Sequence, residues 1–409
     1  MKRALVLSGG GAKGSYQVGV YKALKKLGIK INIICGTSIG SINGALFCEG
    51  KYNLAKKMWC DVSTYDLFGF DVKDKSIDNY KSIFKFLFKN KGLSFDNASN
   101  YLNKLINERM VRNSRINYGL VTYSYKNKKP LLLTKESIPS GKLIDYIIAS
   151  ASCFPAIEKK KIGNDVLIDG GYYDNLPINL AIQMGADEVI AVDLNAVGFR
   201  KEYDNKKIKV DVIKCLDKTL FTLDFDKDTA IKNISLGYND TMKYYKALDG
   251  NIYTFKLGNI IKNYKSIETS YISLLKDILL IEDEKIKKDI LSITRYRDIF
   301  DNINMKKSIS SIVLESLEYL GDILDIDKSI IYNINTYNKL LVSNIRNLNY
   351  ININKKLKGK MLIGYMYNKY INCKDKEKMY KELFNMALFF QKEFLATIYL
   401  LVISDKYLN

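Results

Sequence analysis

The chain has 409 residues, of which 47% are hydrophobic and 26% charged, and this composition is that of an ordinary globular protein with room for one large and one smaller domain. It contains no histidine, so a Ser-His-Asp triad and any metal site that needs imidazole are excluded. The formal net charge of +20 is spread over both halves, which indicates a lysine-rich composition more than a nucleic-acid-binding segment.

The first 195 or so residues alternate between predicted strands and helices. Apolar or alternating runs predict strands at 3–8, 30–35, 118–125, 130–134, 166–168 and 188–194, and helical spacing predicts helices at 15–27, 39–48, 142–152 and 180–184. This alternation predicts a three-layer α/β/α fold with a mostly parallel central sheet. We assign residues 1–257 to this domain, including a polar loop at 201–209, a helix near 226–245 and a strand near 251–256.

Residues 258–409 are predicted to form an all-helical region, because glycine and proline are scarce there, and the sequence does not state its role. Its apolar segment 384–403 is better explained as a helix buried against its neighbours than as a membrane contact. In the first domain, the aromatic segment 66–95 is expected to be helix packing, with a lid or an acyl-chain pocket as the alternative. Its phenylalanines are Phe68, Phe70, Phe84, Phe86 and Phe88.

The apolar run at residues 4–7 is too short for a signal peptide, and no stretch reaches the length of a membrane-spanning helix. The six cysteines lack the paired spacing of a disulfide framework or a metal site. We therefore expect a cytoplasmic protein, with peripheral attachment to the inner face of the membrane as the alternative. No metal or other cofactor is required by any motif.

The first motif is a nucleophile elbow, Gly36-Thr37-Ser38-Ile39-Gly40. An apolar strand precedes it and a helix of small residues follows, which is the context in which a sharp turn exposes a serine hydroxyl at a helix N-terminus. Bulky residues would clash in this turn, so Gly36 and Gly40 are expected to shape it. The alternative is a glycine turn in which Ser38 only caps the helix.

The second motif is a glycine loop, Gly9-Gly10-Gly11-Ala12-Lys13-Gly14, between the first strand and the first helix. Its spacing also fits a dinucleotide-binding fingerprint, but that function requires an acidic residue at the end of the second strand. The elbow occupies that place. The loop is therefore more consistent with an oxyanion hole, in which backbone N–H groups converge on a developing negative charge.

The third motif, Asp169-Gly170-Gly171, places a carboxylate on a turn after a short strand. By itself it would indicate only a tight turn.

The three motifs occur in an order that resembles the patatin-like phospholipase family, in particular its bacterial type with a helical C-terminal extension. The resemblance rests on Gly-Gly-Gly-x-Lys-Gly, Gly-x-Ser-x-Gly and Asp-Gly-Gly-x-x-x-Asn-x-Pro, helped by the segment at 149–155, and covers residues 3–194. It implies a serine-aspartate dyad without histidine. Ser38 would be the nucleophile and Asp169 the base, with Gly9, Gly10, Gly11 and Gly14 forming the oxyanion loop and Gly170 and Gly171 the turn after the base.

The resemblance further implies a lipid acyl hydrolase of the phospholipase A or lysophospholipase type that acts through an acyl-serine intermediate. Its partner would be a phospholipid or another acyl-lipid, the basic composition is compatible with an anionic membrane, and no nucleic acid is expected. A free carboxylate is a weak base, so Asp169 is expected to be partly desolvated. An acyltransferase with the same dyad and a non-catalytic membrane-binding protein remain as alternatives. Acyl position, head group, regulation and oligomeric state stay open.

Overall fold

The computed structural model describes residues 1–63, 96–203, 208–216, 225–279, 308–348 and 357–407. The predicted aromatic segment at 66–95 lies entirely outside these residues. The chain divides into two compact units, Met1–Tyr244 and Tyr245–Asn409. This division precedes the expected boundary at residue 257, because Tyr253 and Phe255 are buried in the core of the second unit.

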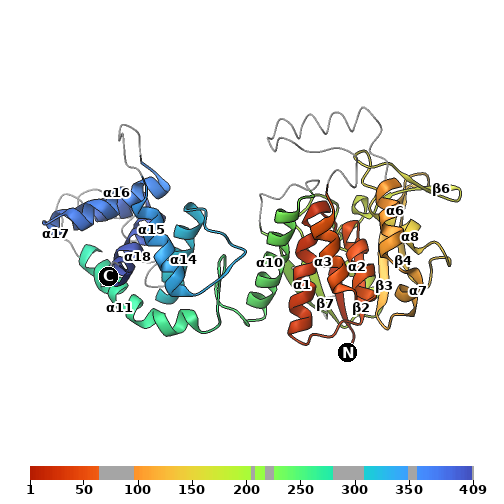
Figure 1. The fold of residues 1–409 in the computed structure, drawn as a ribbon, viewed down its shortest axis with the longest axis horizontal. Helices are drawn as coiled ribbons and strands as arrows, with labels where there is room; N and C mark the ends of the chain where they lie inside the picture. Colours follow the sequence, from red (N-terminus) through yellow and green to blue (C-terminus); the bar gives the residue numbers. More distant parts are fainter. Residues whose placement is uncertain (64–95, 204–207, 217–224, 280–307, 349–356, 408–409) are drawn as a thin grey trace. The chain divides into compact units, whose positions relative to one another are not determined.

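The first unit is built on an eight-stranded, mostly parallel sheet, as predicted (Figure 1). Its parallel part has the order β3-β2-β1-β7-β8, formed by β1 (Arg3–Leu7), β2 (Ile33–Thr37), β3 (Asn117–Ser124), β7 (Glu188–Asp193) and β8 (Lys209–Lys214). Three antiparallel strands extend it beyond β3, namely β4 (Lys129–Thr134), β5 (Lys160–Ile162) and β6 (Asp165–Asp169). The central strands are continuous apolar runs because both of their faces are covered.

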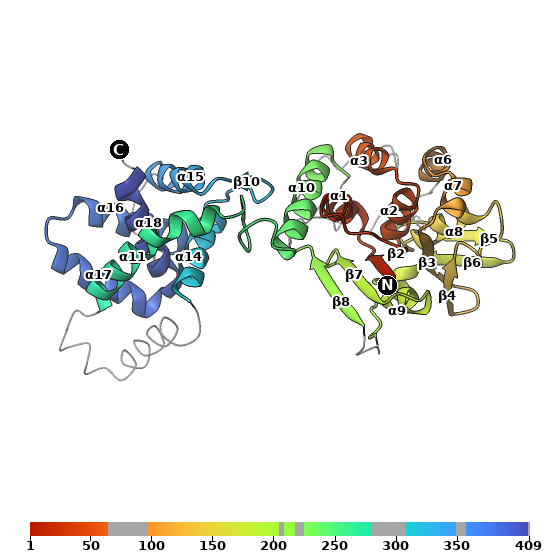
Figure 2. The same cartoon turned by 90° about the horizontal axis from the view of Figure 1, so that it is seen from below.

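Helices cover both faces of this sheet, which confirms the three-layer prediction (Figure 2). On one face lie α1 (Ser15–Lys26), α2 (Ile39–Cys48), α3 (Tyr52–Asp61) and α10 (Lys227–Tyr244), and on the other lies α9 (Ile178–Gln183). The other helical elements of this unit are α6 (Asp96–Leu105), α7 (Glu108–Asn113), α8 (Leu143–Ser150) and the 3-10 turns η1 (Gly11–Gly14) and η2 (Gly170–Tyr172). Val6, Cys35 and Ala191 belong to the cluster that α9 covers.

Helices α1 and α10 approach each other at the backbone level. A Cβ atom built on Gly19 of α1 would lie 1.9 Å from the carbonyl oxygen of Ile234. Reciprocally, a Cβ atom on Gly237 of α10 would lie 2.0 Å from the carbonyl oxygen of Tyr16. The hydroxyl of Tyr16 also donates a hydrogen bond of 2.8 Å to Asp240. These glycines let α10 pack directly on the helix that follows the glycine loop.

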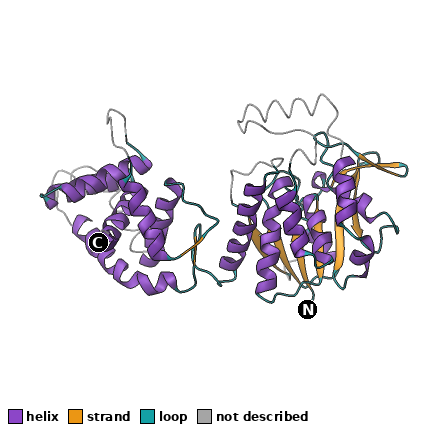
Figure 3. Cartoon of the chain, in the orientation of Figure 1, coloured by secondary structure: helices purple, strands orange, loops and turns teal. Residues whose placement is uncertain are grey.

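In its described residues, the second unit consists of helices and one pair of two-residue strands, joined by loops (Figure 3). It contains α11 (Asn259–Leu279), α14 (Ile309–Ile323), α15 (Ile334–Arg346), α16 (Gly359–Asn372), α17 (Lys376–Phe389) and α18 (Gln391–Tyr407), with β9 (Thr254–Phe255) parallel to β10 (Ile331–Tyr332). Helix α18 is apolar on all sides, and Phe394, Ile398 and Leu400 are fully buried. The prediction that segment 384–403 is buried against neighbouring helices is therefore confirmed. Among the described residues, no helix combines the length and the hydropathy needed to span a membrane.

Candidate active site

Ser38 is the single residue between β2 and α2. Its backbone angles, φ 55° and ψ −128°, are ones that residues other than glycine rarely adopt. A Cβ atom on Gly40 would lie 2.3 Å from the carbonyl oxygen of Leu7, so the turn admits no side chain there. The strained peptide is held by hydrogen bonds. The Ser38 N–H donates to Ser150 Oγ at 3.0 Å, and the Ser38 carbonyl accepts from the Ser41 hydroxyl at 2.7 Å. Ser38 is half-buried, with its hydroxyl on the pocket described below.

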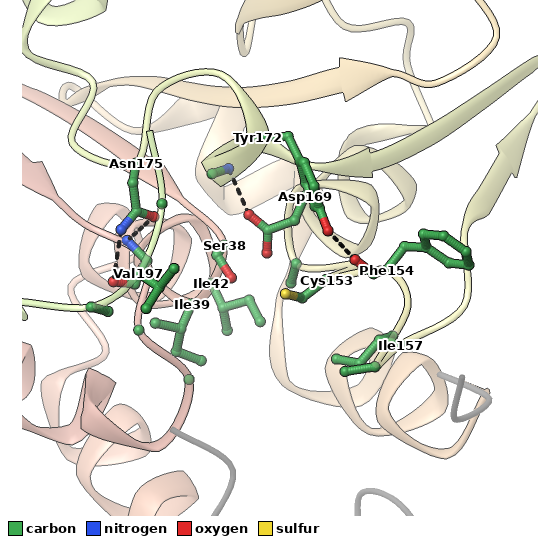
Figure 4. Close-up of a pocket in the computed structure, with 18 of the residues that line it drawn as sticks. Ser38, Ile39, Ile42, Cys153, Phe154, Ile157, Asp169, Tyr172, Asn175 and Val197 are labelled. Carbon is green, nitrogen blue, oxygen red and sulfur yellow. Dashed lines mark hydrogen bonds between the residues drawn. The ribbon is translucent and has the colours of Figure 1, made fainter. Parts of the chain in front are cut away.

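Asp169 ends strand β6 and is only 4% exposed. Its Oδ1 accepts a hydrogen bond of 2.7 Å from the N–H of Gly171. Burial raises the pKa of Asp169 to about 6, although its hydrogen bonds with the Ser38 side chain and the Gly171 N–H act in the opposite direction. The expected desolvation of this carboxylate is thus present. Figure 4 shows Ser38 and Asp169 directed into the same space.

The register of strand β3 explains why these two residues meet. Strand β2 pairs with β3 as far as Thr37 opposite Val121, and there β2 ends. Strand β6 arrives from the other direction and ends with Asp169 opposite Thr122, the next residue of β3. Because β4 occupies the other edge of β3, the ends of β2 and β6 meet on one edge. Gly170 fits this junction because a Cβ atom there would lie 2.1 Å from the carbonyl oxygen of Val121.

The glycine loop lies directly against Ser38. A Cβ atom on Gly9 would lie 2.9 Å from the Ser38 Cβ. The Gly9 N–H is already engaged, since it donates to the backbone and side-chain oxygens of Asn175, each at 3.2 Å. Gly10 and Gly11 line the pocket, and within the described part of the chain their N–H groups have no hydrogen-bond acceptor. Gly14 is packed against Ile39 and Trp59, away from the pocket lining.

Asn175, the asparagine of the Asp-Gly-Gly-x-x-x-Asn-x-Pro motif, is a residue of this site whose role the motif alone does not reveal. Its side chain is 2% exposed and pairs with both backbone groups of Gly9, since Nδ2 also lies 3.5 Å from the Gly9 carbonyl oxygen. Its own N–H donates to the Phe199 carbonyl at 2.6 Å. A Cβ atom on Gly171 would lie 3.2 Å from Asn175 Oδ1. Asn175 therefore connects the glycine loop with the turn after Asp169.

Ser38 and Asp169 open into a pocket of about 630 Å³ that is lined mainly by apolar side chains (Figure 4). Its wall comes from α2, α3, α6, the segment after α8 and the loop after β7. The wall residues include Ile39, Ile42, Met58, Trp59, Leu102, Cys153, Ile157, Val197 and Phe225. A long, apolar ligand with one polar, reactive group fits such a lining.

Part of the chain is similar to a known protein family. The family model described as patatin-like phospholipase matches residues 5–182. The chain is 34% identical over 208 residues to patatin-like phospholipase domain-containing protein 7 of Rattus norvegicus, covering 49% of this chain and 14% of that protein. Lysophospholipase nte1 of Aspergillus terreus is 32% identical over 198 residues, which are 47% of this chain and 12% of that protein. The chain thus matches a small part of the length of these relatives.

Among solved structures, VipD from Legionella pneumophila aligns with 98% of this chain and 91% of its own, at a TM-score of 0.34 and 14% identity. The type III effector protein ExoU aligns with 97% of this chain at a TM-score of 0.26 and 12% identity. The family match covers the glycine loop, the elbow and the Asp-Gly-Gly turn together. Over residues 5–182, which hold all three motifs, the chain is similar to the patatin-like phospholipase family.

Proposed function

We propose that this domain is a lipid acyl hydrolase in which Ser38 is the nucleophile and Asp169 its general base. One observation carries the proposal. A strained serine and a buried aspartate with a raised pKa line the same apolar pocket, in a chain without histidine. The family match and the apolar lining support an acyl-lipid substrate. Because several relatives are named lysophospholipases, lysophospholipids are the first substrates to test.

In the proposed reaction, the Ser38 hydroxyl attacks the ester carbonyl and its proton passes to the free oxygen of Asp169. The other oxygen of Asp169 stays fixed by the Gly171 N–H. The N–H groups of Gly10 and Gly11 bind the oxyanion, and each such donor stabilises a transition state by about 3–4 kcal/mol. The protonated Asp169 then gives the proton to the leaving alcohol. Water, deprotonated by the same carboxylate, cleaves the acyl-serine and releases the fatty acid.

The function is tested by incubating the protein with a panel of mixed-chain phospholipids and lysophospholipids and measuring released fatty acid by mass spectrometry. The chain that is released identifies the acyl position. A fluorophosphonate should label Ser38, and peptide mapping locates the adduct. If an added lipid alcohol receives the acyl group in preference to water, the protein is an acyltransferase with the same dyad. The absence of both release and labelling would refute the hydrolase proposal.

The activity should depend on pH through Asp169. The pKa of this carboxyl is raised to about 6, and only its deprotonated form accepts the serine proton. We therefore expect kcat/KM to be constant above about pH 6 and to fall about tenfold per pH unit below it. Initial rates with a substrate that does not titrate in this range measure the profile. An acid limb with an apparent pKa near 4 would contradict the assigned desolvation.

Asn175→Ala should lower kcat more than it raises KM, because it removes the two side-chain hydrogen bonds to Gly9 while leaving the apolar pocket wall in place. We expect a fall in kcat of about 10–100-fold, since a misplaced oxyanion donor loses much of its effect. Asn179→Ala is the matched control, because its side chain donates to the Glu202 carbonyl at the surface and not to the loop. Equal effects of the two substitutions on kcat would refute the positioning role.

A further inference from the structure

A group of aromatic and apolar side chains borders the pocket, and we name it the rim strip. It consists of the exposed Tyr125, Tyr172, Val197 and Phe199 and the half-buried Phe154. Val197 is 102% exposed and Phe199 66%, followed by Tyr125 at 48% and Tyr172 at 40%. Single exposed apolar residues are ordinary on a protein surface, whereas a contiguous group beside a binding pocket marks an interaction site.

Contacts between the rim residues show that the strip is continuous. The Phe199 N–H donates to the carbonyl of Gly171 at 2.9 Å, which places Phe199 next to Tyr172. The Tyr172 hydroxyl donates to the carbonyl of Phe154 (Figure 4). The Phe154 ring meets the edge of the Tyr125 ring, with 6.1 Å between centroids. The strip therefore joins four separate segments of the chain, and all its members except Tyr125 also line the pocket.

The strip carries positive charge at its Tyr125 end. Lys159 Nζ lies 3.4 Å from the centroid of the Tyr125 ring and 4.2 Å from that of Phe154. Further lysines, all exposed, lie on the turn after Tyr125, at the start of β4 and on β5, namely Lys126, Lys128, Lys129 and Lys161. Aromatic and apolar side chains beside lysines are the composition of surfaces that bind the head-group region of anionic membranes.

We propose that the rim strip is the surface by which this chain docks on an anionic lipid membrane. Val197, Phe199 and Tyr172 would enter the head-group and acyl boundary, while Lys159 and its neighbours would contact lipid phosphates. The pocket would then open into the lipid, so an acyl chain reaches Ser38 without crossing water. The inference rests on the proposed lipid hydrolase function, because that function makes a lipid membrane the expected partner of the strip. The lysines beside the strip favour anionic lipid.

The test uses the full chain carrying Ser38→Ala, so that the vesicles are not hydrolysed. Co-sedimentation with phosphatidylcholine vesicles containing about 30 mol% phosphatidylserine measures the partition coefficient, and pure phosphatidylcholine vesicles measure binding without anionic lipid. We expect binding to the anionic vesicles to be at least about tenfold tighter, and to weaken between about 0.1 and 0.5 M NaCl.

Two substitutions in this background locate the surface. Phe199→Asp should lower the partition coefficient at least tenfold, because it removes an aromatic ring that would insert into the lipid and adds a charge that lipid phosphates repel. Lys159→Gln should lower it about fivefold, which corresponds to one lysine near an anionic surface. Phe389→Asp is the matched control, since Phe389 of the second unit is also 66% exposed but lies outside the strip, and it should change nothing.

The possible outcomes separate this inference from the proposed function. Tight binding that is lost with Phe199→Asp and Lys159→Gln but kept with Phe389→Asp supports docking, whether or not the wild-type protein releases fatty acid. Absence of binding by the Ser38→Ala parent overturns docking, while fatty-acid release from dispersed lipid by the wild type still supports the hydrolase. Binding that both rim variants retain, or that Phe389→Asp removes, also overturns the assignment to this strip.

Discussion

Ser38→Ala should lower kcat for fatty-acid release by at least about 10⁴-fold, because no other group in the site replaces the attacking oxygen. Asp169→Asn should lower it by about 10²–10⁴-fold, since a neutral amide cannot take the serine proton. The two residues share one proton transfer, so the double variant should be no slower than Ser38→Ala alone. Initial rates over a range of substrate concentrations give kcat and KM for all three.

Asp174→Asn provides the matched control for the base. Asp174 is also buried, and burial raises its pKa to about 6, but it accepts hydrogen bonds from the N–H groups of Leu176 and Lys201 and does not line the pocket. We expect the acid limb near pH 6 to remain in this variant and to vanish in Asp169→Asn. If Asp174→Asn removes the limb, or Asp169→Asn keeps most of the activity, Asp169 is not the base.

Gly19→Ala should destabilise the first unit by about 3 kcal/mol, at the upper end of the usual cost of overpacking. Alanine ordinarily stabilises a helix interior by up to about 1 kcal/mol relative to glycine, so the sign of the change is itself informative. Here the added Cβ would lie 1.9 Å from the Ile234 carbonyl oxygen and 2.7 Å from the Tyr238 nitrogen. Both are backbone atoms, so α1 and α10 would have to separate.

Differential scanning calorimetry measures this effect as a decrease in the Tm of the first unit of about 6–12 °C. Lys26→Ala is the control on the same helix, because Lys26 is exposed, and it should change the free energy of unfolding by less than about 0.5 kcal/mol. A Gly19→Ala protein as stable as the wild type would show that α1 and α10 do not pack through this glycine.

The central strands and their flanking helices could be predicted because their apolar runs are long and uniform. Strands β1, β2 and β7 are fully or almost fully buried, and each gives a clear hydrophobic run in the sequence. Strand β8 (Lys209–Lys214) was not predicted, since three of its six residues are charged and it lies at the edge of the sheet, where only part of a strand is buried. Strand β5 was missed because three residues, two of them lysines, carry no strand pattern.

The candidate site was predictable in its residues but not in its contacts. The glycines around Ser38 and after Asp169 reveal turns, because only small residues fit there. Nothing in the sequence states that β6 ends one residue beyond β2 along β3, since pairing register is a tertiary property. Hydrogen bonds between distant segments are likewise not visible in a sequence. The Gly9 N–H was therefore expected in the oxyanion loop, whereas in the fold it is hydrogen-bonded to Asn175.

Strand β3 acts as a common template for the two proposed catalytic residues, and this has a consequence for how the domain can diverge. Ser38 and Asp169 are each placed by their distance along β3, not by the length of chain between them. The long connection from α2 to β3 can therefore gain or lose residues without displacing the reacting atoms. Such changes would reshape the part of the apolar pocket lining that α3 and α6 provide. Substrate preference and chemistry would then evolve on separate parts of the same chain.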